Sequence, residues 1–180
     1  MKYCSNCGTL VHLRVPEGDT LPRYVCSVCN IIHYRNPKMV VGCIPKWEDQ
    51  VLLCRRAIKP RCGFWTLPAG FMENAETLAQ AAARETLEEA NARVEIGNLY
   101  AIYNLPDINQ VYFLFLAELL DLNFEPGIES LDVKLFREEE VPWDEMAFRV
   151  ISMPLKRYFE ECRADQPNFY IDTLESINRP

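Results

Sequence analysis

The 180-residue sequence has no apolar run approaching the ~18 residues that cross a membrane as a helix. Its first residues, MKYCSNCGTL, lack the apolar segment of a secretory signal. Basic residues are too few to balance the acidic ones, because 19 Lys and Arg face 26 Asp and Glu, for a net charge of −7. This deficit disfavours nonspecific binding to a nucleic-acid backbone or an anionic membrane. We therefore expect a cytoplasmic protein with neither a membrane nor nucleic acid as its partner.

Two nucleotide-binding signatures are also missing. The sequence contains no Walker-type loop and no Gly-x-Gly-x-x-Gly fingerprint, so ATP-driven and hydride-transfer chemistry have no support. It contains no internal repeat or low-complexity linker. Half of its residues are hydrophobic (49%) and a quarter are charged, which is typical of a globular chain.

Cysteine is abundant, with eight residues in the chain. Four of them form two Cys-x2-Cys pairs, Cys4 with Cys7 and Cys26 with Cys29, separated by 18 residues. Each pair places two thiolates on one tight turn, and two such turns make the closed four-thiolate site that zinc favours. A segment this short cannot build its own core, so a structural Zn²⁺ explains the pattern better than redox cysteines do. Lone cysteines are most often buried in apolar surroundings, and we expect this for Cys43, Cys54, Cys62 and Cys162.

The segment around these cysteines is weakly basic, with a charge of +3 over residues 1–38. Zinc ribbons often bind RNA or DNA, but few aromatic residues interleave with these positive charges. We therefore expect a ribbon that braces the main domain or a dimer interface. The domains predicted are a zinc ribbon at 1–36, a main domain at 37–165 and a C-terminal tail at 166–180.

The main domain alternates strand and helix patterns. Residues 39–56 form two β-rich runs around a polar break, which indicates a hairpin, and residues 63–72 indicate strand and turn. Residues 76–91 are rich in Ala, Leu and Glu and predict a helix that ends at Asn91. Further strands are predicted at 94–103, 110–119 and 133–136, and a second helix, interrupted near Pro154, at 143–162. This order favours a mixed α/β domain.

The first helix carries three carboxylates on one face, because Glu85, Glu88 and Glu89 lie at i, i+3 and i+4. Like charges at this spacing repel by ~0.2–0.5 kcal/mol per pair on an exposed helix. A hard cation with oxygen ligands would compensate for this repulsion. Taken alone, however, an acidic helical face is more often a solvated surface.

The residues around this face decide between the two interpretations. From Gly70 the sequence reads G-x5-E-x7-R-E-x2-E-E, with Glu76, Arg84 and the three carboxylates at its fixed positions. This resembles GX5EX7REUXEEXGU, the signature of the Nudix hydrolases, which cleave nucleoside diphosphates linked to another moiety. Thr86 and Ala92 stand where the bulky aliphatic U is expected. Asn91 replaces the last glycine, a mild change because Asn also tolerates the left-handed conformation of a helix end.

The resemblance implies an α/β/α sandwich of helices about a mixed sheet, preceded by the ribbon. It implies that Glu85 and Glu89 bind Mg²⁺ or Mn²⁺, that Glu88 assists, and that the carbonyl of Ala69 is a further ligand. Glu76 and Arg84 would pair and hold the loop against the helix. Downstream, residues 129–142 resemble another family stretch, whose leading residue, here Glu129, reaches the metal or acts as the base. A solvated acid is the alternative for Glu129.

The resemblance extends to particular substrates. NADH pyrophosphatases share the ribbon, but they carry an SQPWPFP-type motif that the stretch 100–110 lacks. NPKMVVG at 36–42, WTLPAG at 65–70, PGxES at 126–130 and the end of the tail at 177–180 are similar to the plant-chloroplast FAD and ADP-ribose pyrophosphatases and their bacterial relatives. Cleavage of FAD or ADP-ribose would release AMP with FMN or ribose 5-phosphate.

Aromatic side chains could stack on the base at ~1–3 kcal/mol each. The candidates are Tyr103, Tyr112 and Phe64, although aromatic residues on strands are more often core residues. Gln110 or Asn104 could read the base edge, and Trp65 is expected to pack beneath the loop. Homodimers are common among such relatives, so a dimer is expected.

Three other functions stay open. A nucleotide-sensing or RNA-binding regulator could keep the fold and lose turnover, although the intact Glu85, Glu88 and Glu89 argue against it. Hydrolysis of NADH, or of an RNA cap held by the ribbon, is a further alternative.

Overall fold

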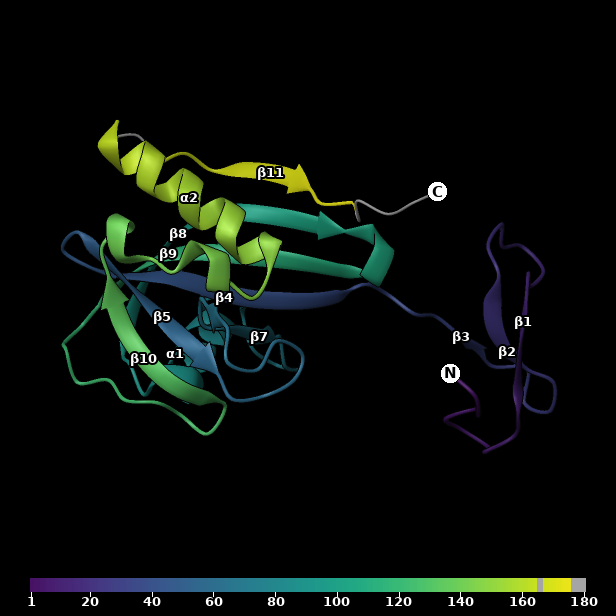
Figure 1. Cartoon of the computed structure of the whole chain (residues 1–180). Coiled ribbons are helices and arrows are strands. Elements are labelled where there is room, and N and C mark those ends of the chain that lie inside the picture. The colour runs from purple at the N-terminus through teal and green to yellow at the C-terminus, as the bar shows by residue number, and fades with distance from the viewer. Residues whose placement is uncertain (165–166, 176–180) are drawn as a thin grey trace. The chain divides into compact units, whose positions relative to one another are not determined.

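A computed structural model describes residues 1–164 and 167–175 (Figure 1). The chain divides into two compact units, Met1–Pro37 and Lys38–Pro180. The smaller unit is a three-stranded antiparallel sheet of β1 (Val11–Arg14), β2 (Arg23–Cys26) and β3 (Ile32–His33), in that order. Its buried core contains little more than Cys4, Val11, Val25 and Cys26. A core of this size does not stabilise a fold by itself, which agrees with the need for a metal.

The larger unit is built on one eight-stranded mixed sheet in the order β10-β5-β4-β9-β8-β11, with β6 paired to β5 and β7 to β4. β4 runs parallel to β9 and β11 runs parallel to β8, while the other pairs are antiparallel. Its strands are β4 (Lys38–Trp47), β5 (Gln50–Arg56), β6 (Trp65–Thr66), β7 (Ala69–Phe71), β8 (Val94–Leu105), β9 (Gln110–Leu119), β10 (Ser130–Phe136) and β11 (Tyr170–Thr173).

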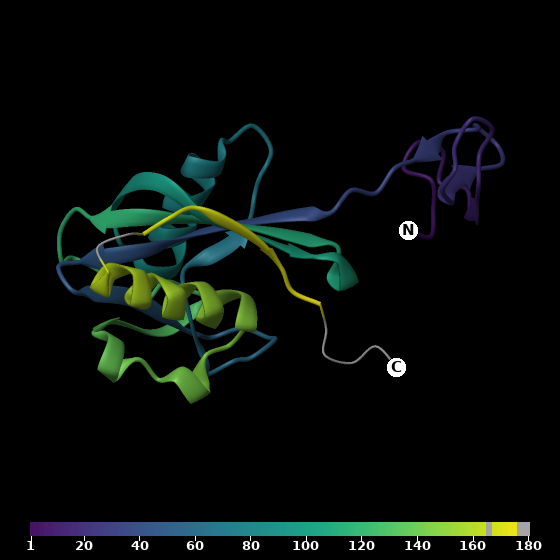
Figure 2. The same ribbon diagram turned by 90° about the horizontal axis from the view of Figure 1, so that it is seen from above.

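Two helices, α1 (Leu78–Ala90) and α2 (Arg149–Arg163), cover opposite faces of this sheet (Figures 1 and 2). Side chains on β4 alternate between the faces: Val41 and Cys43 pack with Ala81 and Ala82 of α1, whereas Ile44 joins the core that includes residues of α2. The same alternation follows from the period of two along any strand. The α/β/α sandwich expected from the sequence is therefore confirmed. Short 3-10 helices lie at Pro106–Ile108, Glu138–Glu140 and Trp143–Glu145.

The predicted hairpin, the first helix and the strands at 94–103 and 110–119 are present, with small shifts at their ends. Pro154 lies inside α2 and does not end it, and the 3-10 helix at Trp143–Glu145 occupies the expected start of that helix. The tail at 166–180, for which the sequence analysis predicted no helix or strand, contributes β11 to the edge of the sheet. The end of the tail at 177–180 lies outside the described residues.

The lone cysteines divide into two pairs. Cys43 and Cys54 are buried as expected, but Cys62 and Cys162 are exposed, so that prediction was wrong for these two. Cys62 lies in the loop after β5, and Cys162 lies in the last turn of α2 on the outer side of the helix. No helix in the described part of the chain is long and apolar enough to span a membrane.

Candidate active site

Helix α1 has well-defined ends that fix the position of its carboxylates. Thr77 caps its start: the Thr77 hydroxyl accepts from the Gln80 backbone N–H at 3.2 Å, and the Gln80 side chain accepts from the Thr77 N–H at 2.8 Å. This reciprocal arrangement satisfies two of the backbone donors at the helix start. At the other end, Asn91 adopts the left-handed conformation, with φ 47° and ψ 22°. Asparagine therefore serves where the family signature has glycine.

Two of the three signature glutamates on α1, Glu85 and Glu89, are buried, each only 8% exposed. They lie one helical turn apart on the face of α1 that packs on the sheet. Burial raises the pKa of Glu85, although the adjacent Arg84 opposes the rise. Burial also raises the pKa of Glu89, to about 8, and the charge of Glu85 adds to this effect. Two buried, mutually repelling carboxylates are costly unless a cation neutralises them.

Arg84 joins the helix to the loop before it. Its guanidinium donates to both carboxylate oxygens of Glu76, at 2.8 and 2.9 Å, and to the backbone carbonyl of Phe71 at 3.1 Å. It also donates to Glu85 at 2.8 Å and to Glu88 at 2.9 Å, while Glu88 faces solvent. The hydrogen bonds from Arg84, followed by that from the Glu73 backbone, lower the pKa of Glu76 to about 2. The pair that the resemblance predicts between Glu76 and Arg84 is thus present, and it fixes the loop to α1.

Gly70 of β7 lies directly against the Glu85 carboxylate. A Cβ atom at Gly70 would come within 2.3–2.4 Å of the carboxylate atoms of Glu85. Real Cβ atoms do not approach so closely, so only glycine leaves room for this carboxylate. The backbone N–H of the neighbouring Ala69 also interacts with Glu89 and counteracts the rise in its pKa. Ala69 and Gly70 at the start of β7 therefore contact both buried carboxylates from the sheet side.

Glu129 approaches the same place from a loop that is distant in sequence. It precedes β10, its carbonyl accepts from the Ala57 N–H at 2.8 Å, and its side chain is exposed. The negative charge of Glu129 contributes to the raised pKa values of both Glu85 and Glu89. The structure thus brings a fourth carboxylate close to the buried pair.

This set of donors suits a hard divalent cation. Carboxylate and carbonyl oxygens are the ligands that Mg²⁺ and Mn²⁺ prefer, and Glu85 and Glu89 are buried carboxylates that need a compensating charge. Glu88, Glu129 and the Ala69 backbone lie next to them. In the structure Arg84 supplies part of the compensation through Glu85 and Glu88. Among the described residues, the cysteines of the ribbon form a compact group of metal-binding donor atoms, and these carboxylates do not.

A cavity of about 970 Å³ opens beside this group, and its wall includes Ala69 and Gly70. Ligand pockets are typically ~300–1,000 Å³, so this cavity can hold a molecule of dinucleotide size. Tyr112, Phe64 and Gln110, which the sequence suggested as base-binding residues, all line it. Phe64 also packs against the guanidinium of Arg61, whose central carbon lies 5.3 Å from the ring centroid.

Tyr103 and Asn104 do not line the cavity. Tyr103 is 2% exposed in the main core, and its hydroxyl lies 3.1 Å from that of Tyr170 on β11. The side chain of Asn104 donates to the backbone of Asp172 at 3.3 Å. Both residues therefore fasten β11 to β8. Trp65 packs in the core against Phe136, as expected, with ring centroids 4.9 Å apart.

The sequence did not point to Arg56, which lines the cavity at the end of β5. Its side chain donates to the Pro60 carbonyl at 3.0 Å and its guanidinium lies 5.2 Å from the centroid of Phe148. Its positive charge lowers the pKa of Glu89 against the effect of burial. A guanidinium held in this way is well placed to bind the phosphate oxygens of a ligand in the cavity. Arg56 is the second of two arginines at the end of a strand, and this common pattern in the sequence gives no indication of a ligand-binding residue.

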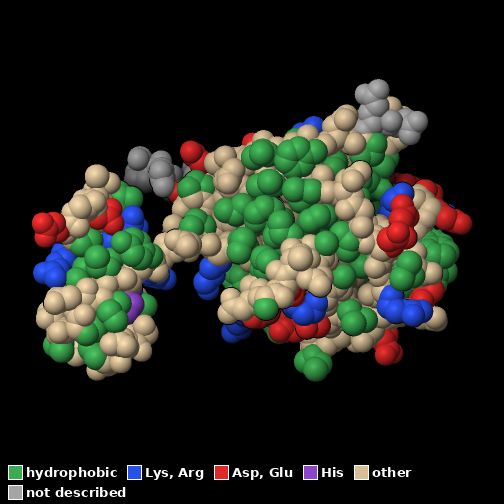
Figure 3. Space-filling view, turned by 180° about the vertical axis from the view of Figure 1, so that it is seen from behind, with side chains coloured by type: hydrophobic (Ala, Val, Ile, Leu, Met, Phe, Trp, Pro, Cys, Tyr) green, Lys and Arg blue, Asp and Glu red, His purple; other side chains and the backbone are tan. Residues whose placement is uncertain are grey.

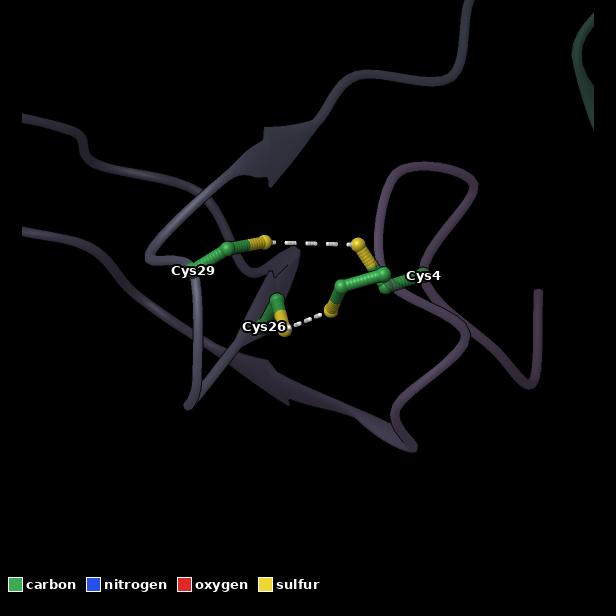
Figure 4. Close-up of side chains that lie close together, drawn as sticks. Cys4, Cys26 and Cys29 are labelled. Carbon is green, nitrogen blue, oxygen red and sulfur yellow. Dashed lines mark hydrogen bonds between the residues drawn. The ribbon is translucent and has the colours of Figure 1, made fainter.

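The four cysteines of the ribbon form a compact group whose sulfur atoms all lie within 4.8 Å of one another. Cys4 Sγ is 3.6 Å from Cys29 Sγ (Figure 4), and Cys7 Sγ is 3.5 Å from Cys26 Sγ. This is the donor set of a structural zinc site. The sequence did not single out His33, whose Nε2 lies 3.3 Å from Cys4 Sγ in a buried position. Such a contact to a ligating sulfur is typical of the outer shell of metal sites.

Comparison with known proteins agrees with this geometry. A model of the NUDIX domain matches residues 36–155, and one described as Nudix N-terminal, a zinc ribbon, matches residues 2–35. The solved structure of a NUDIX hydrolase from Nitrosomonas europaea is 66% identical with a TM-score of 0.96, covering 98% of this chain and 100% of that one. An ADP-ribose pyrophosphatase from Streptococcus suis has the same fold at 22% identity, with a TM-score of 0.62 over 77% of this chain and 100% of that one.

A curated relative, the NAD-capped RNA hydrolase NudC of Salmonella heidelberg, is 30% identical over 143 residues. The match covers 78% of this chain and 53% of that protein, so the chain spans about half the length of the curated relatives it matches. The family models therefore agree with the spacing of the signature residues, the sandwich fold and the cysteine group. The chain belongs to the Nudix hydrolase family, as a NUDIX domain preceded by the zinc ribbon found at the N-terminus of some members.

Proposed function

We propose that this chain is a metal-dependent pyrophosphohydrolase that cleaves a nucleoside diphosphate linked to another moiety. One observation carries the proposal: Glu85 and Glu89 are buried side by side behind the Ala69–Gly70 wall of a cavity of dinucleotide size. Without a cation, ionising both buried carboxylates would destabilise the fold, which is why the pKa of Glu89 is raised. Their position suits a cation that contacts a ligand in the cavity.

Mg²⁺ or Mn²⁺ would be held by Glu85 and Glu89, with Glu88, Glu129 and the carbonyl of Ala69 as the further donors. Bound there, the cation would neutralise phosphoryl oxygens and lower the pKa of bound water. Arg84 would release part of its hold on Glu85 as the cation replaces its charge.

The side chains around the cavity have separate tasks in this proposal. Arg56 binds the pyrophosphate oxygens and offsets their charge next to Glu89. Glu129, exposed beside the buried pair, accepts the proton of the attacking water; alternatively, it is a direct metal ligand. Tyr112 and Phe64 provide ring faces for a base. The in-line attack of water on one phosphorus would release a nucleoside monophosphate and the other half of the substrate with its own phosphate.

For the substrate, the 30% identity to NudC favours a nicotinamide dinucleotide of the NAD type, either free or at the end of an RNA. FAD and ADP-ribose are the second candidates, supported by the sequence segments at 36–42, 65–70 and 126–130. The likeness to solved ADP-ribose pyrophosphatases near 22% identity supports the fold and adds nothing on the substrate. All of these molecules share an ADP half, so one cavity could admit each of them.

The test is a hydrolysis panel with NAD⁺, NADH, FAD, ADP-ribose, a nucleoside triphosphate and a short NAD-capped RNA. Each reaction is run with Mg²⁺ or Mn²⁺ and resolved by chromatography. We expect one class of substrate to be cleaved, with release of AMP from a dinucleotide or of a 5′-monophosphate RNA from the capped RNA. The Glu89→Gln variant should lose ~10²-fold or more of this activity. If no substrate turns over but nucleotides still bind, the chain is a sensor and the proposal fails.

We further propose that the protein acts as a homodimer. Apolar side chains gather over the middle of the larger unit in the view from behind, with charged groups mostly toward its edge (Figure 3). Exposed apolar surface of this kind often marks an interface. Light scattering at micromolar concentration should give twice the chain mass of 20.9 kDa, and a monomer mass would refute the proposal.

A further inference from the structure

Asn91 ends the catalytic helix at the position where the family signature has glycine. Its backbone adopts the left-handed conformation and its N–H donates to the Leu87 carbonyl at 2.9 Å. Glycine would satisfy both requirements without strain. Helix capping therefore leaves the side-chain amide of Asn91 available for another contact.

That amide reaches across to the loop that leads to Glu129. Asn91 Nδ2 donates to the backbone carbonyls of Glu125, at 3.2 Å, and Pro126, at 3.4 Å. Glycine at this position could make neither bond. The side chain thus links the end of α1 to a segment 34–35 residues further along the chain.

Backbone contacts extend this link. The Glu125 N–H donates to the Ala90 carbonyl and the Gly127 N–H to the Glu89 carbonyl, both at 3.0 Å. Gly127 lies so close to the helix that an added Cβ would be 1.8 Å from the Glu88 carbonyl oxygen. The segment 125–127 is therefore fixed to the same turn of α1 that carries Glu88 and Glu89.

Glu129 lies two residues beyond this attachment. The turn closes with a hydrogen bond from the Ser130 N–H to the Gly127 carbonyl at 3.1 Å. Ile128 at its tip is 99% exposed, so the tip itself gains no support from side-chain packing within the described part of the chain. The turn is held at its ends: by the hydrogen bonds to the helix end, by the one between Ala57 and Glu129, and by the pairing of the buried Ser130 with Arg56 of β5.

We infer that Asn91 is a positioning residue, whose amide clamps the Glu125–Ser130 turn to α1 and so sets the distance of the Glu129 carboxylate from Glu85 and Glu89. This inference rests on the proposed hydrolase function. It assigns a role to a departure from the family signature that otherwise looks like a neutral replacement. A chain with glycine here would hold the turn by its backbone alone.

The test compares Asn91→Gly, which keeps the helix end but removes the amide, with Asn98→Gly, a matched change at an exposed asparagine on β8. We expect Asn91→Gly to lower kcat by about 10-fold and to weaken Mn²⁺ binding, with KM nearly unchanged, as loss of an outer-shell partner does. Asn98→Gly should change none of these quantities.

A double-mutant cycle with Glu129→Gln separates positioning from general loosening of the fold. If the clamp acts through Glu129, Asn91→Gly should cost less than about 2-fold in the Glu129→Gln background. If the losses of the two single variants simply multiply in the double variant, the inference is overturned. Wild-type kcat and Mn²⁺ affinity in Asn91→Gly would also overturn it.

Hydrogen exchange keeps the inference testable if the wild type hydrolyses nothing in the panel, an outcome that refutes only the proposed function. The amides of Gly127 and Ser130 should then exchange faster in Asn91→Gly than in wild type, together with the weaker Mn²⁺ binding. Unchanged exchange and affinity would overturn the clamp independently of activity.

Discussion

Replacing Gly70 by alanine should strongly reduce the rate of catalysis while leaving the fold intact. The new Cβ would lie 2.3 Å from Glu85 Oε2. Because C···O contacts seldom fall below ~3.3 Å, the carboxylate must retreat by about 1 Å. It is the end of a flexible side chain, so the shift costs little stability, but the hydrogen bond from Arg84 to Glu85 and the alignment with Glu89 change.

The magnitude follows from what such a displacement costs a catalytic group. A misplacement of ~1 Å can reduce a rate by ~10²-fold, which corresponds to about 2.7 kcal/mol of transition-state stabilisation. Gly70 is not in the left-handed region of backbone conformation, so alanine itself is tolerated there. It should even restrict the unfolded chain and offset part of any loss, by ~0.4–1 kcal/mol.

The assay measures kcat/KM on the best substrate of the panel, Mn²⁺ affinity by titration, and unfolding in urea. Gly42→Ala is the contrasting control, because its Cβ would lie 2.4 Å from the Pro68 carbonyl oxygen and 2.5 Å from Ala69 Cβ, where backbone must move. We expect Gly70→Ala to lose metal affinity and activity at near-wild-type stability, and Gly42→Ala to lose stability. Wild-type activity in a folded Gly70→Ala protein would refute the proposed role of the Glu85 position.

Three further predictions concern pH, zinc and the cavity. Because burial and then Glu85 raise the pKa of Glu89 to about 8, Mn²⁺ binding should strengthen as pH rises from about 5 to 8 and should release a proton, countable by calorimetry in two buffers. For the same reason the metal-free protein should lose stability as pH rises from the unfolded pKa near 4.5 through about 8. Glu89→Gln should make this slope shallower in urea titrations, although the raised pKa of Glu85 still contributes to it; a flat wild-type profile would contradict the prediction. Strong chelation or Cys26→Ser should unfold residues 1–37, since structural zinc contributes ~10–16 kcal/mol of folding free energy in small zinc domains. The amide NMR signals of the larger unit should keep their dispersion, and elemental analysis should find one zinc per chain. A ribbon that stays folded without zinc would contradict the prediction. Arg56→Lys should raise KM by about 10-fold, because lysine keeps the charge but loses the planar contact with Phe148 and the two-pronged hydrogen bonding to phosphate. Arg55→Lys, outside the cavity wall, should leave KM unchanged. Equal KM values for the two variants would exclude Arg56 from substrate binding.

The sequence alone determined the features that depend on short spacings. The Cys-x2-Cys pairs, the carboxylates at i, i+3 and i+4, and the caps of α1 are encoded within a few residues of one another, where helix and turn geometry leave little choice. This is why the zinc group and the helix could be predicted, whereas the Glu76–Arg84 pair was expected from the resemblance to the family signature.

Only the tertiary structure decided which distant residues meet. Tyr103 and Tyr112 are cross-strand partners and look alike in sequence, yet Tyr112 lines the cavity and Tyr103 joins the core, because β11 covers Tyr103. Arg56, at the end of β5, and the amide of Asn91 gained their partners in the same way, through contacts between separate segments. Such contacts depend on how strands pair and loops close across the whole chain, and no local pattern of residues specifies that pairing.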